Sequence, residues 1–197
     1  MDFVLASGSE SRRRLLTAAG VTFTAIPADV DEDALKAALL RTATPVLEVA
    51  AHLARAKALA VSARRPASLV LGADQTLLLD DEIVSKCSDL AAARQLLLRL
   101  RGRTHLLVGG YVLARDGAEI WRHGETARLT MRDFSDGFLD DYLAEEGEGV
   151  LSAVGCYKLE GLGAQLFTSV EGDYFSILGL ALRPLLAELR KQGVLRT

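Results

Sequence analysis

Short apolar runs alternate along this chain with longer segments of helical periodicity, and this alternation constrains the fold more than any other feature. Phe3 to Ala6 and Leu69 to Gly72 are too short for helices, so each predicts a buried strand. Between them, Pro45 to Ala63 has apolar residues at helical spacing and predicts one long helix that stops before Pro66. Strands that alternate with helices indicate an α/β protein with a layered sheet.

The remaining elements are predicted from the same kinds of pattern. Further helices are expected over residues 12–19, 90–100, 136–145 and 178–191. Further strands are expected over residues 21–25, 104–113, 119–130 and 167–170. Asp116-Gly117 predicts a hairpin turn between two of these strands. The acidic residues 29–33 are expected to form a loop.

Composition excludes several classes of protein. The chain has 197 residues, half of them apolar, which excludes intrinsic disorder and favours one domain or two small lobes. Twenty-three Lys and Arg against 26 Asp and Glu leave a net charge of −3. A general nucleic-acid-binding protein usually carries a basic face, so that function is not expected. Any phosphate chemistry must depend on a few well-placed cations.

The cysteines and the N-terminus indicate the compartment. Cys87 and Cys156 are too few for a disulfide framework and lack zinc-site spacing, so two reduced, partly buried thiols are expected. The N-terminal residues lack a basic region followed by a long apolar run, and no apolar stretch reaches the ~18–20 residues that span a bilayer. We expect a cytoplasmic protein with no membrane partner.

The first candidate site is the loop after the first strand. Ser7, Gly8 and Ser9 follow this strand, and Arg12 and Arg13 stand in the first turn of the next helix. Free N–H groups at a helix N-terminus, small hydroxyl residues and guanidinium groups together favour an anion site. The alternative is a capped helix with exposed arginines. The loop is not a Walker loop, because no GxxxxGK[ST] motif occurs.

Two carboxylates form the second candidate. Asp74 is expected directly after a buried strand, where open α/β sheets present their ligands, and could act as a general base or as a ligand of a hard metal. Glu32 in the acidic loop could share that metal, although the loop lacks the glycine of an EF-hand. The alternative for Asp74 is an Asp that caps a helix or stands in a turn, and the alternative for Glu32 is a solvated acidic turn.

The other polar candidates are weaker when each is considered alone. Lys57 projects from the long helix among alanines, and Lys86 follows the strand pair expected around Glu82, so either could be a solvated charge. The three histidines lie far apart, and His105 is expected to be a structural histidine inside a strand. No GxSxG motif indicates a serine nucleophile.

Taken together and in this order, the segments resemble the Maf family of nucleoside triphosphate pyrophosphatases. The resemblance covers nearly the whole chain. The matching segments are Leu5–Leu16, Val30-Asp31-Glu32, Ala56-Lys57-Ala58, Gly72-Ala73-Asp74-Gln75, Lys86, Gly102-Arg103-Thr104-His105, Glu160-Gly161-Leu162-Gly163-Ala164, Gly172-Asp173-Tyr174 and Gly179-Leu180. No single segment is diagnostic, but the series in this order is highly specific.

The resemblance implies a fold, a reaction and an assembly. The fold would be a single Maf-like domain over residues 1–197, with a twisted mixed sheet flanked by helices and two lobes around a deep cleft. The reaction would cut a nucleoside triphosphate between the α and β phosphates, giving a monophosphate and pyrophosphate, with Mg²⁺ or Mn²⁺. The assembly would be a homodimer.

The resemblance also assigns roles to residues. Asp74 would orient or deprotonate the attacking water, and Glu32 and Asp74 would hold the metal. The groups expected to bind the triphosphate are Ser7, Ser9, Arg12, Arg13, Lys57 and Lys86.

Three positions are similar to those by which the family selects a base, and here they are Ser11, Gln75 and Glu160. The branch that prefers dTTP and UTP typically has Arg, Thr and Gln there. Gln75 and Glu160 look like the branch that prefers 7-methyl-GTP, which usually has Trp in place of Ser11. Two alternatives are a nucleotide-binding regulator of cell division without turnover, and a structural interaction protein.

Overall fold

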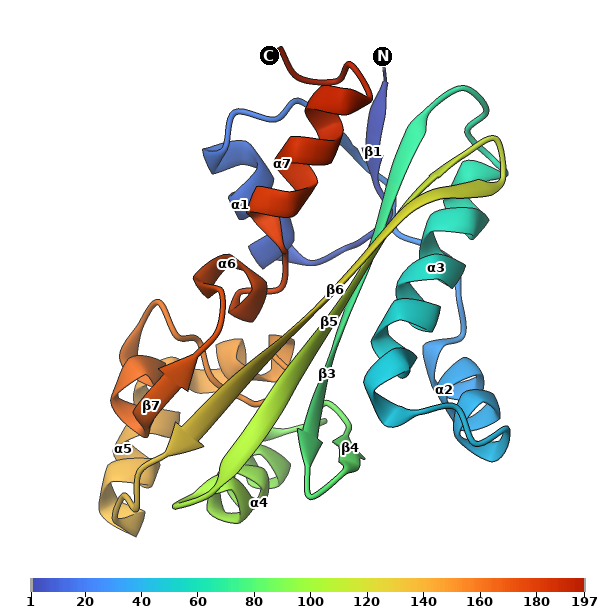
Figure 1. Ribbon diagram of the computed structural model, residues 1–197. Helices are drawn as coiled ribbons and strands as arrows, with labels where there is room; N and C mark the ends of the chain where they lie inside the picture. The colour runs from blue at the N-terminus through green and yellow to red at the C-terminus, as the bar shows by residue number, and fades with distance from the viewer. Residues whose placement is uncertain (1, 197) are drawn as a thin grey trace. The chain divides into compact units, whose positions relative to one another are not determined.

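The computed structural model describes residues 2–196, and these residues form a seven-stranded mixed sheet flanked by helices (Figure 1). The strands are β1 (Phe3–Leu5), β2 (Thr24–Ala25), β3 (Leu69–Leu79), β4 (Glu82–Val84), β5 (Thr104–Arg115), β6 (Ala118–Met131) and β7 (Phe167–Glu171). Their order is β2-β1-β3-β5-β6-β7, with β4 paired to β3. β1 is parallel to β2 and β3, whereas β4 and β7 pair antiparallel with β3 and β6. The expected α/β fold is confirmed.

Helices connect these strands. The α-helices are α1 (Glu10–Ala18), α2 (Glu32–Arg41), α3 (Val49–Ser62), α4 (Leu90–Leu100), α5 (Asp136–Glu146), α6 (Tyr174–Ile177) and α7 (Leu182–Lys191). Three short 3-10 helices are η1 (Val46–Glu48), η2 (Gly147–Ser152) and η3 (Leu162–Leu166). In the described part of the chain, none of these helices has the length and apolar character needed to cross a bilayer.

The chain divides into two compact units. The first consists of Met1–Gln75, Gly109–Glu125 and Asp173–Thr197, and the second of Thr76–Val108 and Thr126–Gly172. β3, β5 and β6 contribute residues to both units. The sheet, α1, α3, α6 and α7 of the first unit position most of the candidate residues.

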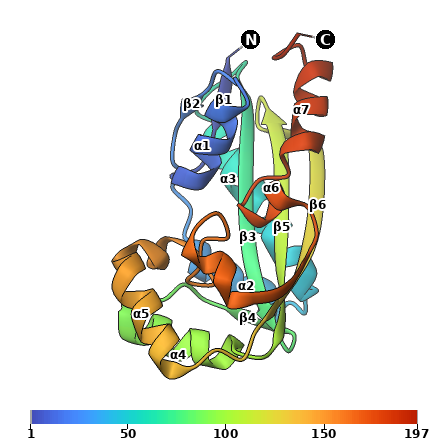
Figure 2. The same ribbon diagram turned by 90° about the vertical axis from the view of Figure 1, so that its left-hand side faces the viewer.

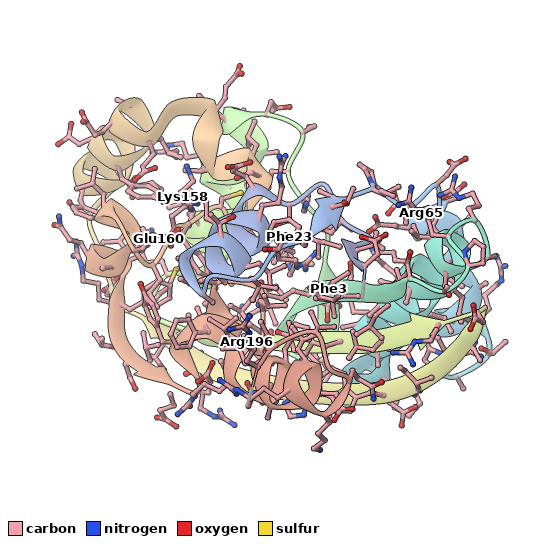
Figure 3. All side chains as sticks on the ribbon, turned by 90° about the horizontal axis from the view of Figure 1, so that it is seen from above. Phe3, Phe23, Arg65, Lys158, Glu160 and Arg196 are labelled. Carbon is pink, nitrogen blue, oxygen red and sulfur yellow. The ribbon has the colours of Figure 1, made fainter. Side chains whose placement is uncertain are left out.

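The parts of β1, β3 and β5 in the first unit are buried on both faces, and successive side chains point to opposite faces. On one face, Phe3, Leu69 and Leu71 pack with residues of α1 and α7. Phe23 lies against the same core, and Figure 3 labels it and Phe3. On the other face, Val70 packs against Val61 of α3. Figure 2 shows α1 and α7 in front of the strands and α3 behind them.

Two glycines allow α3 to approach the sheet closely. A Cβ on Gly72 would lie 2.0 Å from the carbonyl oxygen of Ala54, and one on Gly110 would lie 2.4 Å from the amide nitrogen of Ala51. Neither position has room for a side chain, because the obstacle is helix backbone that cannot rotate away. The close approach brings the sheet-facing residues of α3, Lys57 among them, against β3.

Several boundaries match the sequence predictions. The helix over 90–100 is found as predicted, and Asp116 and Gly117 both have positive φ, as the tight turn between β5 and β6 requires. The predicted helix over 12–19 begins two residues earlier, at Glu10. The predicted strand over 21–25 is shorter and comprises only Thr24 and Ala25.

The prediction of an acidic loop over residues 29–33 is wrong at its second half. Asp31 accepts a hydrogen bond from the amide of Ala34 at 2.9 Å and caps α2, so Glu32 is the first residue of a helix. Acidic residues in a first turn interact favourably with the helix dipole, which explains why this charge cluster folds as a helix start.

The predicted strand Leu69–Gly72 is too short, because β3 continues to Leu79. Residues 76–79 are all buried, so the apolar run resumes after Gln75. Asp74 therefore lies inside a strand instead of after one.

Two predicted helices begin later than expected. The segment from Pro45 to Ala63 begins as the 3-10 helix η1, and α3 starts only at Val49. The predicted helix over 178–191 is wrong at its start, because α7 begins only at Leu182. Leu178 and Gly179 form the turn after α6, and the φ of Gly179, +104°, is outside the helical region.

Candidate active site

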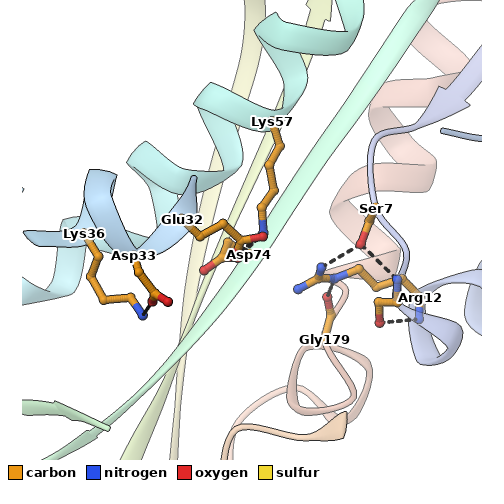
Figure 4. A network of polar contacts seen from close by, with 9 residues as sticks. Ser7, Arg12, Glu32, Asp33, Lys36, Lys57, Asp74 and Gly179 are labelled. Atoms are coloured by element: carbon orange, nitrogen blue, oxygen red, sulfur yellow. Dashed lines mark hydrogen bonds and ion pairs between the residues drawn. The ribbon is translucent and has the colours of Figure 1, made fainter. Parts of the chain in front are cut away.

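The loop after β1 builds a buried cation into the N-terminus of α1. Ser9 caps this helix, and its Oγ accepts a hydrogen bond from the amide of Arg12 at 3.4 Å. Nη1 of Arg12 donates to Oγ of Ser7 at 3.0 Å, and Arg12 is only 8% exposed (Figure 4). The first N–H groups of a helix lack intrahelical partners and carry partial positive charge. The loop thus combines these groups with a fixed guanidinium, which excludes the alternative in which Arg12 is an exposed arginine.

Arg13 does not share this environment. Its guanidinium lies 3.9 Å from the carboxylate of Glu10, and about half of its side chain is exposed. The predicted role of Arg13 in substrate binding stays a prediction.

The second cluster joins α2, α3 and β3 through Lys57. Nζ of Lys57 lies 2.6 Å from Oδ1 of Asp74 and 2.9 Å from Oε2 of Glu32 (Figure 4). Lys57 and Asp74 are each 7% exposed, whereas about half of the Glu32 side chain is exposed. One ammonium therefore pairs with two carboxylates. Lys57 is not a solvated charge, and Asp74 is not an Asp that only caps a turn or helix.

The periodicities of α3 and β3 explain why these groups meet. Lys57 follows Ala54 by three residues and precedes Val61 by four, and both of these face the sheet. Asp74 follows Gly72 by two residues, so its side chain points to the α3 face of β3.

The register of the parallel strands brings the two clusters to the same end of β1. Leu5 pairs with Leu71, and the amide of Ala6 donates to the carbonyl oxygen of Leu71 at 2.8 Å. β1 then ends, while β3 continues to Asp74 three residues further on. Asp74 is thus inside its own strand but just beyond the carboxyl end of the neighbouring parallel strand, where α/β sheets commonly bind ligands.

Side chains at the opposite face of β3 hold a segment that the sequence analysis did not identify as part of the site. Gln75, Ser11 and Arg12 all donate to main-chain carbonyls at the end of α6. The hydrogen bonds run from Nε2 of Gln75 to Ser176 O (2.8 Å) and Ile177 O (3.4 Å), from Oγ of Ser11 to Leu178 O (2.6 Å), and from Nε of Arg12 to Gly179 O (2.9 Å). The only sequence signal was the presence of Gly172-Asp173-Tyr174 and Gly179-Leu180 among the family-like segments.

A buried polar group lies beneath this segment. Burial raises the pKa of Tyr111 to about 12, and the same tyrosine stacks on His123. Nε2 of His123 lies 3.7 Å from Oε1 of Glu125. The other carboxylate oxygen of Glu125 accepts a hydrogen bond from the hydroxyl of Ser176. These groups connect the interior of the sheet to the segment that Gln75 contacts.

The second unit contains Lys86 and Glu160. Lys86 is exposed in the loop between β4 and α4, and Asp89 in the same loop caps α4. Glu160 is exposed just before η3, and the neighbouring Lys158 pairs with Glu146 at 3.8 Å (Figure 3).

The carboxylates of Asp74 and Glu32 are too few to hold a divalent metal by themselves. Among residues 2–196, no group of three or more His, Cys, Asp or Glu side chains is placed to hold a metal ion. Lys57 contacts one oxygen each of Asp74 and Glu32, so the second oxygen of each carboxylate lies outside this ion pair. Mg²⁺ commonly uses one or two carboxylates together with substrate phosphates, and this pair suits that mode of binding.

Comparison with known proteins decides the family. The family model described as Maf-like protein matches residues 2–192 of the chain. The chain belongs to the Maf family. A 7-methyl-GTP pyrophosphatase of Mesorhizobium japonicum is 52% identical to it over 192 residues, which cover 98% of this chain and 96% of that relative.

Other Maf relatives have the same extent of match. A nucleoside triphosphate pyrophosphatase of Rhodospirillum rubrum is 50% identical, over 98% of this chain and 95% of the relative. A 7-methyl-GTP pyrophosphatase of Brucella abortus is 49% identical, over 98% of this chain and 96% of the relative. The resemblance to the Maf family is confirmed over nearly the whole chain.

Proposed function

We propose that this Maf protein is a nucleoside triphosphate pyrophosphatase that cleaves the bond between the α and β phosphates. The observation that carries the proposal is the Lys57–Asp74 ion pair just beyond the carboxyl end of β1, together with Arg12 buried at the N-terminus of α1. These groups supply a carboxylate and two cations where a polyphosphate needs them. The names of the relatives, which are pyrophosphatases, support the same reaction.

Phosphate binding is assigned to the loop after β1. The N–H groups at the start of α1 and the guanidinium of Arg12 stabilise phosphate oxygens, while Ser7 and Ser9 fix the loop. Arg13 and Lys86 are further candidate ligands of the triphosphate, since both are accessible to solvent.

Hydrolysis is assigned to Asp74. A water oriented by this carboxylate attacks phosphorus, forming a new P–O bond as the α–β bridging P–O bond breaks. The water's proton passes to Asp74, and the electron pair of the broken bond leaves with pyrophosphate. The ammonium group of Lys57 orients Asp74 and offsets the charge of the phosphates.

Mg²⁺ or Mn²⁺ is proposed as the cofactor, and when bound it would supply positive charge to the phosphates. Asp74 and Glu32 would hold it through the oxygens that Lys57 does not contact.

Base selection is assigned to Ser11, Gln75 and Glu160. Two of the relatives are named 7-methyl-GTP pyrophosphatases, which favours a guanine-type base such as 7-methylguanine. A preference for dTTP or UTP is the competing outcome.

The test is pyrophosphate release from a panel of triphosphates with Mg²⁺ or Mn²⁺. The panel includes 7-methyl-GTP, GTP, ATP, dTTP and UTP. Release of pyrophosphate and monophosphate in equal amounts supports the proposal. Nucleotide binding without release would instead support a regulator that does not turn over its ligand.

A further inference from the structure

Four consecutive carbonyls at residues 176–179, here called the carbonyl segment, all accept hydrogen bonds from side chains. The donors are Gln75, Ser11 and Arg12, at donor–acceptor distances of 2.6–3.4 Å. Gln75 and Ser11 are two of the three positions assigned to base selection. The third donor, Arg12, is assigned to the phosphates. The carbonyl segment therefore contacts both the base-selecting and the phosphate-binding residues of the first unit.

The segment depends on these donors for its conformation. α6 has only four residues, so it is too short to be stable on its own. Carbonyls at the end of a helix lack intrahelical partners, and here the three side chains donate to them, while Ser176 O also accepts from the amide of Gly179 at 2.9 Å. Gly179 has a φ of +104°, which other residues rarely adopt, and this turn directs its carbonyl to Nε of Arg12.

Ser176 anchors the segment from behind. Its amide donates to Oδ1 of Asp173 at 2.9 Å, and its hydroxyl is shared between that oxygen and the carboxylate of Glu125. Oδ2 of Asp173 also accepts a hydrogen bond from Nη2 of Arg183 at 2.5 Å. Ser176 is only 5% exposed, so its hydroxyl is removed from solvent. Its main-chain carbonyl accepts the hydrogen bond from Gln75.

The direction of these hydrogen bonds determines what Gln75 and Ser11 can offer a ligand. The amide nitrogen of Gln75 has two hydrogens, and two carbonyls of the segment face it, so its Oε1 is left as an acceptor. The hydroxyl of Ser11 has one hydrogen, which goes to Leu178, so only its lone pairs are left.

We propose that the carbonyl segment is a positioning element that turns Gln75 and Ser11 into acceptors for the base, with Ser176 as its anchoring residue. This inference rests on the proposed function. Two acceptors held by consecutive carbonyls match a base edge with two neighbouring N–H donors, as in guanine and 7-methylguanine. Uracil and thymine present one N–H between two carbonyl oxygens and match such acceptors less well.

Gln75→Glu is the decisive variant. Glutamate has the same shape and retains an acceptor, but its carboxylate cannot donate to the carbonyl segment. If the donors position the side chain, KM for GTP and 7-methyl-GTP rises about tenfold or more, and the preference over UTP falls toward one, while kcat changes less than threefold. If KM for the guanine nucleotides is unchanged or lower, the inference is wrong, because an acceptor alone is then sufficient.

Ser176→Ala tests the anchor. KM for the guanine nucleotides is expected to rise about three- to tenfold with kcat within twofold, and Ser176→Thr is expected to restore it. Ser152→Ala is the control, because it removes the hydroxyl of an exposed serine outside the site, which donates to the main-chain carbonyl of Gly149 at 2.9 Å. Equal effects of Ser176→Ala and Ser152→Ala on KM would contradict the anchoring role.

The dissociation constant of an α,β-methylene analogue of GTP separates this inference from the proposed function. A wild-type protein that binds the analogue but releases no pyrophosphate from any triphosphate overturns the function. In that case the inference is supported if Gln75→Glu raises the dissociation constant of the analogue about tenfold, and it is wrong if the constant does not change. A wild-type protein that does not bind the analogue overturns both.

Discussion

The ammonium group of Lys57 lies 2.6 Å from Oδ1 of Asp74, and both side chains are almost completely buried. Glu32 contacts the same ammonium at 2.9 Å but is half exposed. The three charges are therefore not equivalent: Lys57 has two carboxylate partners, whereas Asp74 is paired with one ammonium.

This asymmetry predicts the stability of two variants. Lys57→Met leaves the buried Asp74 carboxylate without its cation and is expected to lower the free energy of unfolding by about 3–5 kcal/mol. Asp74→Asn leaves Lys57 paired with Glu32 and is expected to cost clearly less. Urea unfolding at pH 7 measures both, and the double variant should be more stable than Lys57→Met alone. Equal losses for the two single variants would contradict this description.

Lys86→Ala is expected to separate activity from folding. Lys86 is exposed, so its removal should leave the melting temperature unchanged. If it neutralises charge on the triphosphate, kcat/KM for pyrophosphate release falls about 10²–10³-fold. Lys36→Ala is a suitable control, because Lys36 pairs with Asp33 on α2 at 3.3 Å and has no assigned role in catalysis. Wild-type kinetics for Lys86→Ala would remove this residue from the proposed machinery.

His105 predicts loss of stability in mild acid. Burial lowers the pKa of His105 to about 4, and its Nε2 is 2.7 Å from the hydroxyl of Tyr157. Between pH 6.5 and 4 the unfolded chain binds a proton at this position that the folded chain does not, so stability falls as pH falls. The expected contribution is about 2 kcal/mol at pH 5. Urea unfolding of wild type and His105→Gln at pH 7 and pH 5 measures it. A variant with the same pH dependence as wild type would contradict the assignment.

The two thiols are expected to differ in reactivity. Both cysteines are free, as predicted, with Cys87 partly exposed and Cys156 buried. Burial raises the pKa of the Cys156 thiol to about 12, so little thiolate is present at pH 8. Iodoacetamide at pH 8 should modify Cys87 much faster than Cys156, as peptide mass analysis would show. Equal rates in the folded protein would show that Cys156 is more accessible than the structure indicates.

How far the sequence predicts this structure depends on whether local or distant contacts decide each feature. The strand–loop–helix at the N-terminus is local, because Ser9 caps the helix that follows it, and it was predicted correctly in outline. Glu32 and Asp33, the second half of the acidic segment 29–33, were misassigned because the same carboxylates that favour a loop also favour a helix N-terminus. Charge alone does not separate these two cases.

The position of Asp74 depends on strand register. The apolar run before it predicts a strand, but its place relative to the site follows from where the parallel strand β1 ends, which is set by contacts 66 residues apart in the chain, such as Leu5 with Leu71. A prediction from one segment could identify the residue but not its relation to a neighbouring strand.

The carbonyl segment was not predicted because the atoms by which it contacts Gln75, Ser11 and Arg12 are main-chain carbonyl oxygens. Ser11 and Leu178 are 167 residues apart, and any residue type supplies a carbonyl, so composition and spacing carry no signal for the contact. The sequence analysis placed Gly179 inside a predicted helix over 178–191, so the turn that its positive φ makes was not foreseen.

Pyrophosphate release by purified Asp74→Asn protein tests the central claim most directly. The asparagine keeps the shape of the side chain and removes the proton acceptor. With the fold verified by circular dichroism and thermal melting, kcat for the best triphosphate of the panel is expected to fall about 10²–10³-fold. Turnover at the wild-type rate would contradict the assignment of Asp74 as the group that activates water.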